Sequence, residues 1–344
     1  MGAGSVAPVT SGDPAALVGD LSEGELISRF VPLLPRGRAT LVPTGDDAAV
    51  VAAPDGRFVV STDVLVEGHH FRQGWGTARD VGARAAAQNL ADVVAMGAVP
   101  TSMVVGLVLP ATTPVAWVLD LARGLADECG PLGVGVDGGD LSAGERLVVA
   151  VTVHGDLQGR TPVLRSGARP GHVLAHAGGI GRAAAGLAVL TARERGEVLD
   201  DAAVDAVVGS FLRPAPPYAA GPQAADAGAS ALMDVSDGLL RDAGRMARAS
   251  GVELRLDPIA ESLVEDLAGL AAPAQALGSD PAAWLLGGGE DHGLLATFPP
   301  GRPLPAGFRR IGAASAPGPG GPRVVVGPED ADRVTGVGWD HFRA

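Results

Sequence analysis

The sequence contains no lysine, so all 26 of its Lys and Arg residues are arginines. A Walker A loop, the strand lysine of protein kinases, a Schiff-base lysine and a Ser–Lys dyad all need the missing residue. Cysteine is nearly absent too: Cys129 is the one in the chain, which excludes an internal disulfide and a thiolate zinc site. A reduced, cytoplasmic setting fits this cysteine usage best.

Positive charge is also scarce, because the formal net charge is −13. A phosphate backbone or an anionic membrane would be repelled overall, so we expect no nucleic-acid and no membrane partner. The seven histidines contain no HExxH pattern, which disfavours zinc. Residues 1–20 lack the basic start and apolar core of a signal peptide, and prolines interrupt the uncharged run Val93–Leu119.

A chain of 344 residues with 47% hydrophobic side chains is long enough for two domains. Hydrophobic periodicity in the first half predicts strands at Phe58–Val66, Met103–Leu109, Val134–Asp137 and Leu147–His154, and helices at Ala78–Met96 and Val115–Glu128. The polar segment Gly159–Gly171 then predicts a crossover. We therefore expect one domain over 1–157 and a second over 158–344.

The second half alternates strands with helices, which indicates a mixed α/β layer. The predicted strands are His172–Ala177, Ala231–Val235, Val252–Leu256 and Leu294–Phe298, with helices starting at Arg182 and Gly238. We interpret Ala271–Pro281 as a surface excursion. The tail after Pro299 is expected to be rich in loops, with a short strand at Arg323–Val326.

Two adjacent carboxylates, Asp46 and Asp47, stand between a glycine and a run of small apolar residues. They repel each other and resist dehydration, so they need either a solvated turn or a neutralising cation. Further aspartates recur at predicted strand edges and on one helix, beside small residues: Asp63, Asp92, Asp140, Asp234 and Asp237. Each alone is typical of a turn or cap, but together they indicate a hard divalent cation such as magnesium, the usual partner of nucleotide phosphates.

Polar side chains accompany two of these aspartates. In a strand, Ser61 and Asp63 point to the same face. On the predicted helix, Arg84, Gln88 and Asp92 form a stripe on an alanine-rich surface. The pattern leaves open whether this stripe belongs to a site or is the solvated side of the helix.

Two glycine-rich segments are candidates for phosphate contacts. Gly178–Leu187 follows a strand and opens a helix, like a dinucleotide fingerprint, but no strand ending in an acid follows at the required distance, so a nicotinamide cofactor is disfavoured. Gly133–Gly144 is expected to be a flexible loop that brings backbone N–H groups and Asp140 to one phosphate.

Nine motifs follow one another from about residue 45 to the C-terminus: GDDAAVV, STDVLVEGHHF, NLADVVAMGAVP, GGDLSAG, RSGARPG, FLRPAPPY, MDVSDGLLRDAGRMARASG, GGGED and GWDHF. In this order they closely resemble the thiamine-monophosphate kinase family, which belongs to the superfamily of aminoimidazole ribonucleotide synthetase. The resemblance implies a two-domain α/β (α+β) fold in which N-terminal strands form a barrel across a homodimer. It also implies ATP as co-substrate, several magnesium ions, and phosphorylation of thiamine monophosphate to thiamine diphosphate.

The resemblance also implies roles for individual residues. The implied magnesium ligands, direct or through water, are Asp46, Ser61, Thr62, Asp63, Asp92, Asp140, Asp234 and Asp237. The implied ATP contacts are Gly139, Asp140, Arg165 and Ser236, and the implied contacts with thiamine monophosphate are His70, Glu290 and Trp339. No side-chain base is implied, because the acceptor is a phosphate monoester that is already largely dianionic near neutral pH.

The chain departs from the family pattern after Glu290 and Asp291, where His292 and Gly293 replace the usual aromatic residue and acid. The substrate pocket is therefore expected to differ there. Trp339 has two readings, a ring stacked on the thiazolium or a hydrophobic plug for the tail. Two other functions stay open: another ATP-dependent enzyme of the superfamily, such as an aminoimidazole ribonucleotide synthetase-like ligase, and a non-catalytic nucleotide- or metal-binding protein.

Overall fold

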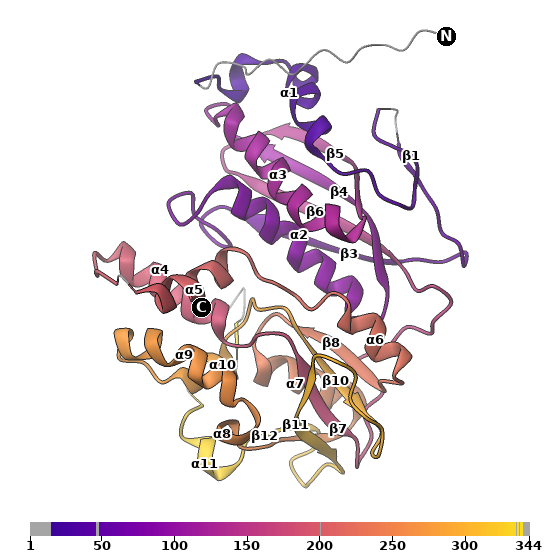
Figure 1. Cartoon of the computed structure of the whole chain (residues 1–344), viewed down its shortest axis with the longest axis vertical. Coiled ribbons are helices and arrows are strands. Elements are labelled where there is room, and N and C mark those ends of the chain that lie inside the picture. Colours follow the sequence, from indigo (N-terminus) through magenta and orange to yellow (C-terminus); the bar gives the residue numbers. More distant parts are fainter. Residues whose placement is uncertain (1–14, 46–47, 200, 335, 337, 340–344) are drawn as a thin grey trace. The chain divides into compact units, whose positions relative to one another are not determined.

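The structure, a computed structural model, describes residues 15–45, 48–199, 201–334, 336, 338 and 339 (Figure 1). It divides into two compact units. The first comprises residues 1–52, 62–86 and 101–152, and the second comprises residues 53–61, 87–100 and 153–344. The second unit thus includes two segments that precede its main part in the sequence.

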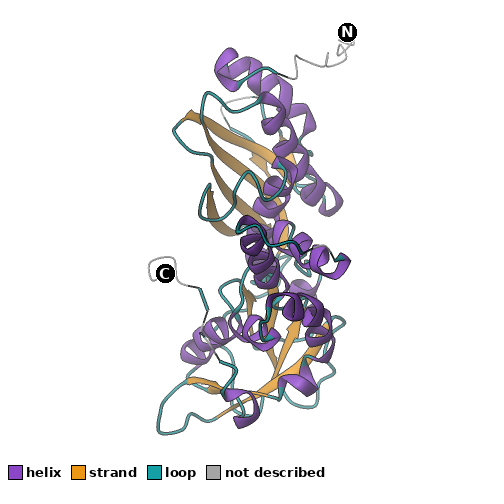
Figure 2. Cartoon of the chain, turned by 90° about the vertical axis from the view of Figure 1, so that its left-hand side faces the viewer, coloured by secondary structure: helices purple, strands orange, loops and turns teal. Residues whose placement is uncertain are grey.

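A four-stranded sheet in the order β3-β6-β4-β5 lies mainly in the first unit, while the start of β3, the start of β4 and the end of β6 belong to the second, as does the second half of the neighbouring helix over 78–94. Its strands are β3 (Val59–Val66), β4 (Val99–Leu109), β5 (Gly135–Ala143) and β6 (Val148–Asp156). Helices α2 (Ala78–Val94) and α3 (Val115–Leu132) lie along one face of this sheet (Figures 1 and 2). A Cβ added to Gly82 or Gly124 would lie 2.1 or 2.0 Å from a carbonyl oxygen of the other helix, so only glycine permits this approach.

Short elements precede and flank the sheet: helix α1 (Glu23–Phe30), the 3-10 turns η1 (Val18–Asp20) and η2 (Val31–Leu33), and strands β1 (Thr40–Val42) and β2 (Val50–Val51). A buried carboxylate, Asp137, ties β1 to the sheet. It accepts hydrogen bonds from the hydroxyls of Thr40 (2.7 Å) and Ser102 (2.5 Å). Two hydroxyl donors satisfy this buried acid and hold β1 against β4 and β5.

The second unit contains a six-stranded sheet in the order β12-β9-β11-β7-β10-β8. Its strands are β7 (Val173–Ala177), β8 (Ala231–Val235), β9 (Glu253–Leu256), β10 (Gly293–Phe298), β11 (Phe308–Ser315) and β12 (Arg323–Val325). All pairings are antiparallel except that of β12 with β9. Eight helices accompany it in the described residues: α4 (Arg182–Glu194), α5 (Ala202–Leu212), α6 (Ala220–Asp226), α7 (Leu239–Ser250), α8 (Ile259–Ser262), α9 (Val264–Leu277), α10 (Pro281–Gly287) and α11 (Pro328–Ala331).

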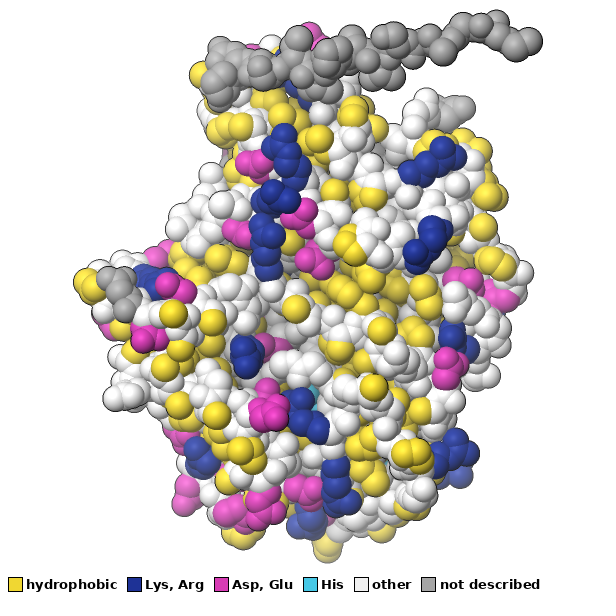
Figure 3. Space-filling model, in the orientation of Figure 1, with side chains coloured by type: hydrophobic (Ala, Val, Ile, Leu, Met, Phe, Trp, Pro, Cys, Tyr) yellow, Lys and Arg dark blue, Asp and Glu magenta, His cyan; other side chains and the backbone are white. Residues whose placement is uncertain are grey.

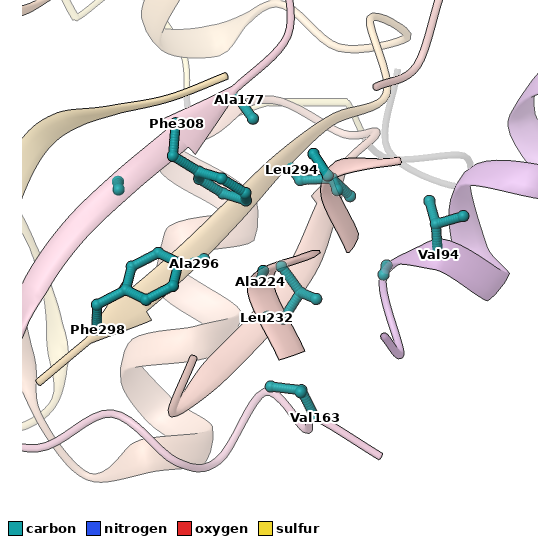
Figure 4. Packing of buried hydrophobic residues seen from close by; sticks show 12 residues of the cluster. Val94, Val163, Ala177, Ala224, Leu232, Leu294, Ala296, Phe298 and Phe308 are labelled. Carbon is teal, nitrogen blue, oxygen red and sulfur yellow. The ribbon is translucent and has the colours of Figure 1, made fainter. Parts of the chain in front are cut away.

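The core on one face of this sheet combines small and aromatic side chains (Figure 4). Phe298 is fully buried and meets Phe308 edge to face, with ring centroids 5.4 Å apart. Alanines of β7, β10 and α6 leave room for these rings, and Val94 and Val163 close the cluster. β8 and β10 are buried along their whole length and β7 at all but its first residue, so both faces of the sheet are covered here, and Asp234 is buried as the last residue but one of β8.

Most predicted elements are confirmed, with β8 at the predicted bounds. The uncharged run Val93–Leu119 is split into the end of α2, strand β4, a loop and the start of α3. No helix among the described residues reaches the length and hydrophobicity needed to cross a bilayer.

Two expectations for the first half are wrong. The segment Gly133–Gly144 is not a flexible loop, because β5 continues through Gly139 and Asp140, with Gly139 paired in parallel with Val105. A Cβ at Gly139 would lie 2.0 Å from the carbonyl oxygen of Val105, so the glycine serves close strand pairing. Helix α3 also runs beyond Glu128 to Leu132. Pro131 removes only one hydrogen bond, so close to the end of the helix that it does not stop it, and Gly133 (φ 68°) caps the helix instead.

In the second half, Ala271–Pro281 is not a surface excursion. It contains the end of α9, the three-residue connection 278–280 and the start of α10. Pro273 is buried inside α9, and Gly278 caps the end of that helix at φ 60°. The tail after Pro299 also holds strand β11, which we did not predict. β11 lies between β7 and β9 within the sheet, so it is formed by partners remote in sequence.

Candidate functional site

Three segments of the second unit meet at the start of α7. The backbone N–H of Glu290 donates to the carbonyl of Ser236 (2.8 Å), and that of Trp339 donates to the carbonyl of Asp237 (2.9 Å). A Cβ at Gly238 would lie 2.6 Å from the carbonyl oxygen of Gly287, so glycine is needed for this approach. The structure therefore brings together four residues that the sequence assigned to ATP, metal and substrate.

Asp234 and His292 extend this cluster. Asp234, the last residue but one of β8, is buried, and its Oδ2 lies 3.4 Å from Nδ1 of His292. The other ring nitrogen of His292, Nε2, lies 3.9 Å from Oε2 of Glu290. The imidazole of His292 thus lies between Asp234, a predicted metal ligand, and Glu290, a predicted substrate contact. The sequence had indicated His292 only as a departure from the family pattern.

Asp237 is engaged with arginines of α7. Its Oδ2 lies 2.5 Å from a guanidinium nitrogen of Arg245 and 3.8 Å from Nε of Arg241. Arg245 also binds Asp242 (2.6 Å), which accepts a further hydrogen bond from the backbone N–H of Asp237 (2.9 Å). Burial, and next the nearby Asp234 carboxylate, raise the pKa of Asp242 to about 6. Sequence reasoning missed both arginines, although their four-residue spacing after Asp237 was visible.

A second pair of predicted ligands meets where β3 faces α2. The hydroxyl of Ser61 donates to Oδ2 of Asp92 at 2.5 Å. The polar stripe of this helix is not its solvated side, since Arg84 and Gln88 are both buried. That alternative is therefore wrong, and the stripe points into the protein.

The remaining predicted residues are placed separately. In the first unit, Thr62 donates its hydroxyl to the carbonyl of Val151 (2.8 Å), Asp63 is half-buried, and Nδ1 of His70 accepts from the N–H of Val66 (3.0 Å). In the second unit, Arg165 is exposed. Asp46 lies outside the described residues, as does its neighbour Asp47.

A mostly apolar pocket opens beside Gly139 and Asp140 in the first unit. Its volume is about 120 Å³, and it is lined by α1, α3 and strands β4 and β5. Ile27 and Phe30 of α1 face Leu121 of α3 across it. Apolar walls with a few polar groups are typical of a small-molecule site.

The contacts among these side chains bear on the expected magnesium site. Across the part of the chain that the structure describes, no three His, Cys, Asp or Glu side chains come close enough to hold an ion. The groups that do meet, Ser61 with Asp92 and Asp234 near Asp242, offer oxygen atoms, which magnesium prefers. The donors therefore fit magnesium in kind, and their assignment as ligands remains a prediction.

The glycine-rich start of α4 is closed by an internal carboxylate. Oδ2 of Asp291 accepts from the N–H of Gly181 (2.7 Å) and Oδ1 accepts from that of Ala183 (2.9 Å). Burial raises the pKa of Asp291 to about 6, against the lowering effect of these two hydrogen bonds. Because Asp291 occupies the place of an anion at this helix terminus, the dinucleotide reading of the segment loses its phosphate site.

Gly293, the second residue that departs from the family pattern, lies against His176. The imidazole of His176, fully buried on β7, fills the space beside Gly293. A Cβ at Gly293 would lie 2.5 Å from Nε2 of His176, so an acid could not stand there without moving the ring. Gly293 and His176 are therefore a matched pair in the sheet.

Two family models match the chain: AIR synthase related protein, N-terminal domain, over residues 45–157, and AIR synthase related protein, C-terminal domain, over residues 169–295. The thiamine-monophosphate kinase of Mycobacterium tuberculosis is 48% identical over 327 residues, covering 94% of this chain and 92% of the relative. That of Corynebacterium glutamicum is 42% identical over 300 residues, covering 86% of each.

Among solved structures, AaThiL complexed with AMPPCP and TMP matches with a TM-score of 0.73 at 29% identity, covering 94% of this chain and 98% of that chain. The expected two-domain α/β fold is thereby confirmed. The chain belongs to the thiamine-monophosphate kinase family, within the AIR synthase related proteins.

Proposed function

We propose that the protein transfers the γ-phosphoryl group of ATP to thiamine monophosphate and forms thiamine diphosphate. One observation carries this proposal: the near full-length match to relatives named thiamine-monophosphate kinase. The match to AaThiL in complex with both AMPPCP, an ATP analogue, and TMP agrees with it. The acceptor is already a dianion near neutral pH, so no side chain has to remove a proton, and the work of the site is positioning and charge neutralisation.

The pocket between α1 and α3 is our candidate for the base of ATP. It is lined mainly by apolar side chains and reaches Gly139 and Asp140, the residues assigned to ATP. An adenine ring would bury its faces against residues such as Phe30 and Leu121, while the phosphates would leave on the side of Asp140. Arg165 and Ser236 are the further ATP contacts proposed from the family pattern.

Magnesium ions would be held by carboxylates and hydroxyls of this chain. The proposed set comprises Asp46, Ser61, Thr62, Asp63, Asp92, Asp140, Asp234 and Asp237. When bound, magnesium would neutralise oxygens of the acceptor and of the γ-phosphate. The hydrogen bond between Ser61 and Asp92 fixes the positions of both oxygen donors before an ion binds. The guanidinium of Arg245 neutralises the negative charge of Asp237.

On the acceptor side, we assign Glu290, Trp339 and His70 to thiamine monophosphate. Glu290 and Trp339 are attached by backbone hydrogen bonds to the consecutive residues Ser236 and Asp237. A carboxylate and an indole whose backbones attach to consecutive residues suit a cationic thiazolium ring, which either side chain can attract.

We also propose a homodimer that uses the N-terminal strands. Val60 and Val64, on one side of the edge strand β3, are 55% and 44% exposed, and Leu41 of β1 is 61% exposed. Exposed apolar side chains along an edge strand favour pairing with another chain. Val64→Asp should convert a dimer into a monomer in light scattering, and a monomeric wild-type protein at assay concentration would contradict the proposal.

Two other expectations stay proposals. The division at 157 and 158 is supported by the family models, which end at residue 157 and begin again at residue 169. The cytoplasmic setting is supported by the single, buried Cys129, whose thiol pKa burial raises.

Figure 3 shows arginine and acidic side chains interspersed on one face, and ion pairs such as Arg79 with Asp127 link the two kinds.

The decisive experiment is incubation of the purified protein with ATP, magnesium and thiamine monophosphate, followed by chromatography for thiamine diphosphate. Product formation that depends on all three components supports the proposal. ATP hydrolysis without thiamine diphosphate, or with aminoimidazole ribonucleotide precursors only, would favour the ligase-like alternative. Nucleotide binding without any turnover would favour the non-catalytic one.

A further inference from the structure

The segment Gly288–Gly293 holds two non-glycine residues in left-handed backbone conformations. Glu290 has φ 72° and His292 has φ 53°, and among the described residues only Gln158 shares this property. Such conformations are unfavourable for residues with a Cβ, so the surrounding structure must impose them. Strain of this kind concentrates at functional sites.

The residue between them, Asp291, attaches the segment to a helix more than a hundred residues away in sequence. Its two carboxylate oxygens accept from Gly181 (2.7 Å) and Ala183 (2.9 Å), the first N–H groups of α4. The side chain is buried, and its negative charge lies at the positive end of the helix dipole. Both oxygens are thus committed to α4.

The flanking residues are held by their own backbone bonds. The N–H of Glu290 donates to Ser236 (2.8 Å), and that of His292 donates to Val235 (3.2 Å). With Asp291 turned towards α4, the side chains of Glu290 and His292 come within 3.9 Å of each other, and His292 approaches Asp234. The carboxylate of Asp291 therefore points towards α4, while the side chains of its two neighbours, Glu290 and His292, lie together at the candidate site.

We propose that Asp291 is a positioning residue for the acceptor substrate: by anchoring the segment to α4, it holds Glu290 and His292 in the conformations that bind thiamine monophosphate. This inference rests on the proposed function. Asp291 does not touch the substrate. It acts through its two neighbours, and α4 serves as the fixed support.

A plain helix cap elsewhere in the chain provides the comparison. Asp330 is also buried and accepts a backbone hydrogen bond, from Ile259 at the start of α8 (2.9 Å). Its neighbours Glu329 and Ala331 lie in α11, so this cap is not flanked by left-handed residues. Asp330→Asn therefore removes the charge of a buried cap, with its pairing to Arg333 (3.4 Å), without touching the segment.

The experiment compares Asp291→Asn with Asp330→Asn and wild type in steady-state kinetics, thermal unfolding and calorimetric titration with thiamine monophosphate. Both variants should unfold at lower temperature. Asp291→Asn should lower kcat/KM for thiamine monophosphate by about 10- to 100-fold while leaving the KM for ATP within about twofold, since misplacing a binding group has costs of this size. Asp330→Asn should leave both KM values as in wild type.

A second variant covers the case in which Asp291→Asn does not fold. Asp291→Ser keeps one oxygen that can cap α4, so it should fold and still bind thiamine monophosphate more weakly than wild type. If the folded variants at position 291 lose thermal stability but keep the wild-type KM and affinity for thiamine monophosphate, Asp291 is only a cap and the inference is wrong. If wild type itself makes no thiamine diphosphate, the proposed function fails instead, which is a separate result.

Discussion

Replacing Trp339 by alanine distinguishes a substrate contact from a hydrophobic plug. The indole is 51% exposed, which is unusual for a residue whose task is to seal a core. Its segment is held by the backbone bond from Trp339 to Asp237 (2.9 Å), which alanine retains. The substitution should therefore remove the ring while leaving the path of the tail intact.

The magnitude follows from the geometry of the site. A cationic ring over a half-exposed indole gains about 0.5–2 kcal/mol, the lower value applying to solvated pairs. With a tenfold change for each 1.4 kcal/mol, Trp339→Ala should weaken binding of thiamine monophosphate roughly 2- to 30-fold. Trp339→Phe should be milder, because a weaker quadrupole remains, and ATP binding should hardly change.

The assay is calorimetric titration with each substrate, with KM values and thermal unfolding measured on the same samples. Trp117→Ala, which truncates a half-buried tryptophan of α3, serves as the control and should change stability without changing affinity for thiamine monophosphate. Suppose that Trp339→Ala lowers the unfolding temperature and leaves the KM for thiamine monophosphate unchanged. The ring is then a plug for the tail, and its assignment to the substrate is refuted.

Three further predictions concern charge, packing and pH. Asp63→Asn should keep the fold but lower kcat by about 100-fold or more, because one formal charge leaves the proposed magnesium site; wild-type turnover at limiting magnesium would contradict this. Phe298→Ala should reduce the free energy of unfolding in urea by about 3–5 kcal/mol, because it empties the space against Phe308; a loss below about 1 kcal/mol would show that the core collapses around the gap. Burial raises the pKa of Asp291 from 3.8 to about 6, so between these pH values the folded protein holds a proton that the unfolded chain has released, and the free energy of unfolding falls as pH rises through this interval; above pH 6 Asp291 is the carboxylate that caps α4. The free energy of unfolding of wild type relative to Asp291→Asn should therefore fall by roughly 3 kcal/mol between pH 4 and 7, and a difference independent of pH would count against a raised pKa.

Local patterns predicted much of the fold. Strand β8 and the start of α4 stand where hydrophobic alternation and the glycine-rich opening placed them. Strand β11 escaped prediction, because its sequence shows little alternation and its hydrogen bonds come from β7 and β9. Helix α9 was missed since Pro273 is normally a helix breaker, yet packing keeps it buried within the helix.

The sequence by itself determined the chemistry that this protein can offer: carboxylates and hydroxyls beside small residues, no lysine, and motifs that identify the family. Tertiary structure alone decided which of these groups act on one another. His292 lies between Asp234 and Glu290, and Asp291 caps a helix 110 residues away. The physical reason is that residue type and spacing set the local preferences of the backbone. Burial and charge pairing, by contrast, arise only when distant segments pack together and exclude water.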